Sequence, residues 1–224
     1  MAESVVAGGG REAVKPRFRG RTHEWAFFAS LGLIPALVGA APTGQARLAA
    51  AVYAASVAGL FGASALYHRV TWRRPSARRW MRRLDHSMIF VLIAGTYTPF
   101  ALLALEGSMG DVVLIVVWAG AAAGVVLKLV WIDAPKQLVA GSYVALGWVA
   151  VAALPGMVDA LGIVATALVL LGGLLYSAGA LVYVLRRPDP SPTVFGYHEI
   201  FHLLVILAAA IQYAVVAFWV LPRG

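Results

Sequence analysis

The sequence predicts an all-α integral membrane protein, built as a bundle of seven transmembrane helices. Three observations lead to this prediction. The chain of 224 residues is 61% hydrophobic and only 12% charged, whereas charged residues make up about a quarter of an average soluble domain. Its apolar residues gather in runs close to the roughly 20 residues that a helix needs to cross a bilayer. Its arginines gather between those runs, as in proteins whose topology is set by basic loops.

The seven apolar runs follow one another with short polar connections. They are about Trp25–Ala41, Leu48–Tyr67, Ser87–Leu105, Val112–Trp131, Leu138–Leu154, Ala160–Leu185 and Tyr197–Val220. The fifth run is short and the sixth is long, so the boundary between them is the least defined. Pro35 and Pro99 lie inside runs, where neighbouring helices can satisfy the carbonyl groups that a kink frees. Gly120 with Gly124, and Gly173 with Ser177, have the spacing of small residues that lets membrane helices approach closely.

Residues 1–21 differ in composition from the rest of the chain. They are polar and basic and lack the hydrophobic region of a signal peptide. We therefore interpret residues 1–21 as a flexible cytoplasmic tail and residues 22–224 as one membrane domain. The basic residues of the tail suit a topology anchor, and contact with anionic lipid headgroups is the alternative.

The basic residues predict the orientation. Seven arginines lie between the second and third runs: Arg69, Arg73, Arg74, Arg78, Arg79, Arg82 and Arg83. Lys136 and the pair Arg186–Arg187 lie in connections that a seven-helix chain places on the same side. By the positive-inside rule this side is cytoplasmic, so we expect a cytoplasmic N-terminus and an external C-terminus. Lys128, near the cytoplasmic end of its run, is expected to reach the interface by snorkelling.

The composition also limits partners and chemistry. There is no cysteine, which excludes disulfides and thiolate metal ligands. A metal site must therefore use His, Asp, Glu or water. The formal net charge of +8 could suggest a nucleic-acid partner, but basic residues between hydrophobic runs are better explained by topology. We expect the bilayer as the environment and no nucleic-acid partner.

The candidate functional residues lie at the cytoplasmic ends of three runs. His198 and His202 begin the last run, and residues four apart share one face of a helix. His68 closes the second run with Ser64 one turn before it, and Asp85 opens the third run. Polar side chains inside a bilayer are costly and normally face the protein interior. Each of these residues alone has an ordinary structural explanation. Ser64 could bond the carbonyl one turn back, and Asp85 could cap the third helix or pair with Arg82. The predicted topology, however, brings all five to a similar depth.

Three neutral imidazoles with one open coordination position are typical of a hydrolytic Zn²⁺ site. We therefore predict that His68, His198 and His202 hold Zn²⁺. Asp85 would accept the proton of the zinc-bound water, and Ser64 would orient Asp85 or stabilise the developing oxyanion. His23 and His86 are interpreted as structural residues.

The same residues carry a resemblance to a known family. The motif consists of Ser64 and His68, then Leu84-Asp85-His86 leading to Ala94–Pro99, then His198-Glu199-Ile200-Phe201-His202. This pattern resembles the hemolysin III family, which is grouped with the progestin and adipoQ receptors and more distantly with the alkaline ceramidases. The resemblance covers all the predicted helices. It implies a seven-helix fold in a bacterial plasma membrane, with zinc on the three matching histidines.

The resemblance also suggests the substrate class, because its enzyme members imply hydrolysis of a lipid amide or ester. The alternative from a different class is a receptor or regulator of lipid or membrane state, in which zinc is structural. Two further alternatives are weaker. A cytolysin would need an amphipathic pore-forming segment, which the sequence lacks. His198-Glu199-x-x-His202 also satisfies the zinc-protease pattern, in which Glu199 would be the base, but no His, Asp or Glu follows His202.

Overall fold

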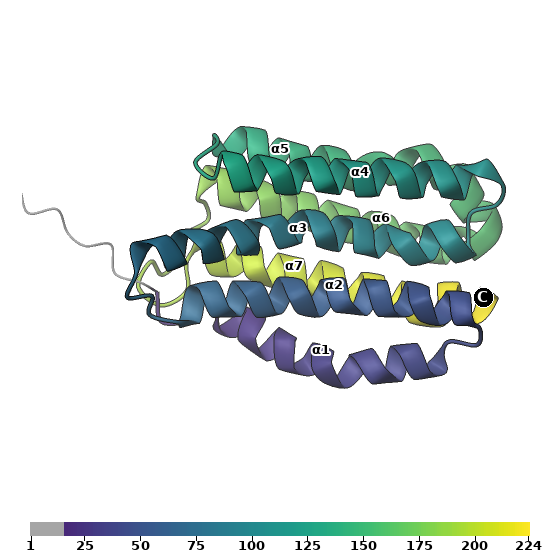
Figure 1. Cartoon of the computed structure of the whole chain (residues 1–224), viewed down its shortest axis with the longest axis horizontal. Helices are drawn as coiled ribbons and strands as arrows, with labels where there is room; N and C mark the ends of the chain where they lie inside the picture. The colour runs from purple at the N-terminus through teal and green to yellow at the C-terminus, as the bar shows by residue number, and fades with distance from the viewer. Residues whose placement is uncertain (1–15) are drawn as a thin grey trace, which may run out of the picture.

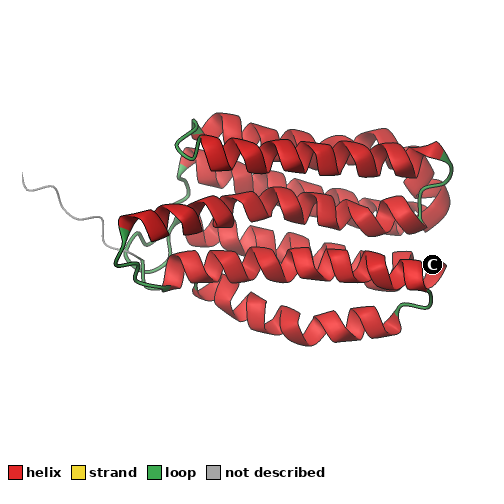
Figure 2. Cartoon of the chain, in the orientation of Figure 1, coloured by secondary structure: helices red, strands yellow, loops and turns green. Residues whose placement is uncertain are grey.

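The computed structural model describes residues 16–224, and within this range the chain is helical apart from its connections and one isolated bridge between Ser191 and Phe195 (Figure 1, Figure 2). The helices are α1 (Arg21–Ala40), α2 (Gly44–Arg69), α3 (Pro75–Leu103), α4 (Ser108–Val130), α5 (Lys136–Gly147), the 3-10 helix η1 (Trp148–Ala153), α6 (Leu154–Leu185), α7 (Tyr197–Val215), the π-helical η2 (Val216–Val220) and the 3-10 turn η3 (Leu221–Arg223). Residues 1–15, most of the predicted tail, lie outside the described residues.

Six helical stretches of the described chain are long and apolar enough to cross a membrane. The fifth and sixth predicted runs fall together in one stretch, Lys136–Leu185, of 50 residues. This stretch is interrupted at Gly162, whose φ of 80° and ψ of 167° are not helical. The indole nitrogen of Trp148 donates a hydrogen bond of 2.9 Å to the Ser177 hydroxyl. Because these two residues lie on either side of Gly162, the chain doubles back there, in a conformation that glycine adopts without steric cost.

The helices lie side by side as one bundle, with α2 packed between α1 and α3, α3 against α4, and α6 against α7 (Figure 1). One end of this bundle, on the left in Figure 1, carries the end of α2 and the start of α3. We call it the basic end, after Arg69, Arg73, Arg82 and the pair Arg186–Arg187. The clustered arginines lie at this end, in the connections between the helices and in the adjoining turns of α2 and α3.

Helix α3 begins at Pro75, well before the predicted start at Ser87. Proline suits this first position because the backbone N–H that it lacks would have no helical partner there. Arg82 and Arg83 are therefore helical rather than part of a loop. Asp85 lies inside α3, so the alternative in which it caps the start of that helix is wrong.

The predicted small residues lie at helix contacts. A Cβ atom on Gly124 would lie 2.3 Å from the Phe90 ring of α3, and one on Gly120 would lie 2.5 Å from Leu146 of α5. Real Cβ atoms do not approach other atoms so closely, so the absence of a side chain lets α4 contact both neighbours. This packing fixes α3, which carries Asp85.

Candidate metal centre

Three histidines from two helices meet near the basic end of the bundle. His198 and His202 lie one turn apart on α7, and His68 ends α2 beside them. The Nε2 atoms of His68 and His198 are 3.2 Å apart. One nitrogen from each of the three rings can be chosen so that all lie within 4.8 Å of one another. His68 and His202 are buried and His198 is half-buried, so this histidine triad is largely removed from solvent.

Two observations indicate that the triad could hold a metal ion. Ligand nitrogens about 2.0–2.1 Å from a tetrahedral Zn²⁺ lie about 3.3 Å apart, close to the separation found between His68 and His198. The Nδ1 atom of His202 is buried and has no hydrogen-bond partner among residues 16–224. A buried nitrogen without a partner is costly. The group could therefore hold a metal ion, and imidazole ligands suit Zn, Cu, Fe and Ni ions.

Asp85 and Ser64 lie beside the triad. The Asp85 Oδ2 atom is 3.9 Å from His68 Nε2 and 3.4 Å from His86 Nδ1, and its side chain is 13% exposed. The Ser64 hydroxyl lies within hydrogen-bonding reach of the same carboxylate. The alternative in which Asp85 pairs with Arg82 is wrong, because Arg82 pairs with Asp133 on the connection before α5. All five predicted site residues thus come together from α2, α3 and α7.

The sequence did not reveal that His23 lies against the triad. It lies in the first turn of α1, and its ring stacks on that of His202 with centroids 3.7 Å apart and an interplanar angle of 8°. It is 3% exposed, and neither ring nitrogen has a hydrogen-bond partner within the described part of the chain. The one available signal was its depth, since it opens a helix at the end where the triad lies. The stacked ring of His23 restricts rotation of the His202 ring.

His86 is held by two hydrogen bonds outside the triad. Its Nδ1 atom lies 2.8 Å from the Arg82 carbonyl oxygen, one turn back on α3, and its own carbonyl accepts from the Tyr143 hydroxyl at 2.9 Å. The residue is thus tied to its own helix and to α5. It contacts Asp85 but does not belong to the group of three.

Glu199 is held by partners that its position in the sequence does not reveal. Its Oε1 atom accepts from Arg19 at 2.5 Å, and its Oε2 atom accepts from the Gly196 backbone N–H at 2.8 Å. Its carboxylate thus pairs with Arg19 and not with the nearby Arg186 or Arg187. Glu199 is fully buried and occupies the first turn of α7, where a carboxylate satisfies free N–H groups. Because both oxygens are engaged, the residue serves as a cap and not as the base of a protease.

The ion pair between Arg19 and Glu199 also fixes the end of the predicted tail. The backbone N–H groups of Arg17 and Phe18 donate to the carbonyls of Thr193 and Val194 at 3.0 and 3.1 Å. Residues 16–20 thus lie along the connection between α6 and α7, and Arg19 reaches the start of α7. This contact brings α1, and with it His23, to the triad.

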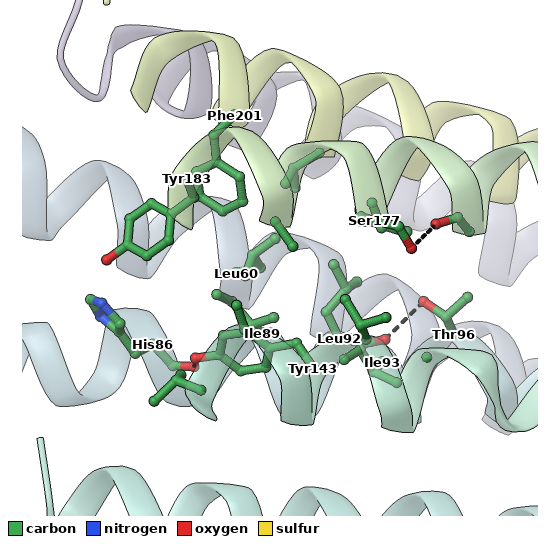
Figure 3. Close-up of a pocket in the computed structure, with 18 of the residues that line it drawn as sticks. Leu60, His86, Ile89, Leu92, Ile93, Thr96, Tyr143, Ser177, Tyr183 and Phe201 are labelled. Carbon is green, nitrogen blue, oxygen red and sulfur yellow. Dashed lines mark hydrogen bonds between the residues drawn. The ribbon is translucent and has the colours of Figure 1, made fainter. Parts of the chain in front are cut away.

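A cavity of about 970 Å³ opens beside the triad. From the basic end it extends along the bundle to Leu105 and Met157, near the opposite end. Figure 3 shows its wall, with Ile89 and Ile93 of α3 facing Tyr183 of α6 and Phe201 of α7. Most of the wall is apolar, and the triad, Ser64 and Asp85 supply polar groups near one end. Such a space suits a molecule with a long apolar chain and a polar group.

Comparison with known proteins points to one family. A family model described as Haemolysin-III related matches residues 11–213. Hemolysin-3 of Bacillus cereus is 33% identical over 182 residues, which cover 81% of this chain and 80% of that protein. The Hemolysin-3 homolog of Bacillus subtilis is 32% identical over 168 residues, or 75% of each chain. The human monocyte to macrophage differentiation factor is 25% identical over 190 residues, which cover 81% of this chain and 76% of that protein.

Proposed function

We propose that this chain, which belongs to the haemolysin-III related family, is a zinc-dependent hydrolase of lipid amides or esters in a bacterial plasma membrane. The observation that carries the proposal is the position of the histidine triad at one end of a large, mainly apolar cavity. A lipid chain suits the apolar wall, and its polar head would then lie beside the triad, Asp85 and Ser64.

Each residue has a role in this proposal. His68, His198 and His202 hold the ion. When bound, Zn²⁺ polarises a carbonyl oxygen and lowers the pKa of water to about 7. Asp85 accepts a proton from the reacting group. Its carboxylate lies 3.9 Å from Nε2 of His68, one of the three proposed ligands, and a general base must lie within reach of the reacting group. Ser64 orients Asp85, and the mainly apolar wall receives the lipid chain.

A second candidate is a receptor or regulator of membrane state with a structural ion. The short distance from Asp85 to His68 supports this reading, because a small shift would let the carboxylate act as a fourth ligand and close the site. The name of one relative, monocyte to macrophage differentiation factor, describes for that protein a part in cell differentiation.

The experiment that separates the two candidates is turnover. Purified, zinc-loaded protein is incubated with lipid amides and esters of one acyl length, and the released fatty acid is measured. We expect release from at least one amide or ester, and none from the His202→Ala variant. A full panel without release from metal-loaded protein would favour the receptor.

The topology that supports this function has seven crossings with a cytoplasmic N-terminus. The reversal at Gly162 supports two crossings within Lys136–Leu185, and the arginines of the basic end support its cytoplasmic placement. Reporter fusions after Arg73 and Arg187 should read cytoplasmic, and fusions after Asp159 and Gly224 should read external. The first fusion follows Arg73 because this residue precedes α3, and the fusion therefore does not interrupt that helix. A cytoplasmic reading at Gly224 would mean an even number of crossings and would contradict the proposal.

A further inference from the structure

Five cationic side chains line the cavity near its basic end. They are Arg19, Arg82, Lys128, Lys136 and Arg186. Two of the five have carboxylate partners: Arg19 pairs with Glu199 and Arg82 with Asp133. Within residues 16–224 the other three form no ion pair. Asp85 lines the same region, so five cationic side chains stand against three carboxylates there and positive charge is in excess.

Lys128 provides the most unusual feature of this region. The predicted snorkelling would expose its ammonium, yet the residue is only 2% exposed, so that expectation is wrong. Its Nζ atom donates to the Ile132 carbonyl oxygen at 3.2 Å, which satisfies one of its three N–H groups. The Asp133 carboxylate acts on the Lys128 ammonium through space but forms no ion pair with it, because it is paired with Arg82. A buried ammonium without a carboxylate in direct contact is costly, and an anion in the adjoining cavity would lower that cost.

Lys136, at the start of α5, and Arg186, at the end of α6, also line the cavity. The Lys136 ammonium lies 5.0 Å from the centre of the Tyr183 ring, an arrangement that holds the cation beside an aromatic face. Arg186 ends α6 in the left-handed conformation, with φ of 54°. Glycine usually occupies this position because other residues are strained there. Arg186 and its neighbour Arg187 are both exposed, but only Arg186 lines the cavity, and Arg187 is what is expected of a residue that only sets topology.

We propose that Lys128, Lys136 and Arg186 form a binding site for the phosphate or carboxylate group of an anionic amphiphile whose chain lies in the apolar part of the cavity. In Figure 3, Tyr183 and His86 lie at one end of the apolar wall formed by Leu60, Ile89 and Ile93. Tyr183, whose ring lies against the Lys136 ammonium, connects the cationic region to that wall. The inference rests on the proposed function in one respect, since it assigns the charge of the molecule that the same cavity would bind.

Binding of hexadecyl phosphate to the full-length protein in a nonionic detergent tests the site. Lys136→Gln and Arg186→Gln should each weaken binding by roughly tenfold, because each removes a charge-assisted contact. Arg187→Gln is the matched control and should stay within about twofold of wild type. Hexadecanol, which has the same chain and no charge, should bind equally to all variants. High salt should weaken only the phosphate ester.

Two further arms identify the source of the anion and its position. Inorganic phosphate should bind far more weakly than hexadecyl phosphate, and equal affinity would contradict a site for an amphiphile. The His202→Ala variant should retain hexadecyl phosphate binding. Loss of binding in that variant, with normal binding in Lys136→Gln and Arg186→Gln, would place the anion on the histidine triad and overturn the proposal. Hexadecyl phosphate has no amide or carboxylic ester, so the result is independent of whether the protein hydrolyses lipids.

Discussion

His198→Ala and His202→Ala should each remove most of the metal from the purified protein, which in the wild type should hold about one zinc ion per chain. Each change takes one of three imidazoles from the group and leaves two donors. Two imidazoles do not complete the three-ligand set of a catalytic zinc site, so the ion should be lost during purification. Elemental analysis of metal per chain is the measurement.

His86→Gln is the matched control for this experiment. His86 lines the same cavity and contacts Asp85, but it lies outside the group of three, so its variant should retain the ion. A chelator should lower the melting temperature of the wild type and of the control, since a ligand that binds the folded state stabilises it. It should leave the melting temperature of His202→Ala unchanged. Stoichiometric zinc in both alanine variants would contradict the site.

Asp85→Asn should lower hydrolysis by roughly 10²–10⁴-fold, the usual contribution of a general base, while the zinc content changes little. The amide is nearly the same size as the carboxylate and leaves His68, His198 and His202 in place. It cannot accept a proton at neutral pH. The measurements are zinc content, melting temperature and release of fatty acid from the best substrate of the panel.

Asp133→Asn provides the control, because Asp133 lines the same cavity but pairs with Arg82. Its variant should hydrolyse a neutral amide at the wild-type rate. If Asp85 were a direct fourth ligand, Asp85→Asn would lower zinc affinity and melting temperature together, and a closed structural site would follow. Unchanged turnover in Asp85→Asn would remove this residue from the mechanism.

Much of the candidate site could be predicted from the sequence. His198 and His202 are four apart in an apolar run, which already places both on one face of a helix. His68, Ser64 and Asp85 lie at the ends of runs that the arginines assign to the same side. Depth in a bilayer depends on position along the chain, and position along the chain is what hydropathy and charge report. The all-helical fold follows from the same information.

The tertiary structure alone decided how the helices are turned about their axes. The outer and inner faces of these helices are both apolar, so hydropathy does not distinguish a side chain facing lipid from one facing a cavity. The stacking of His23 on His202, the pairing of Arg19 with Glu199 and the burial of Lys128 all depend on this rotation. The reversal at Gly162 likewise depends on the packing of Trp148 against Ser177. These contacts join residues far apart in the chain, and only close packing of the whole bundle brings them together.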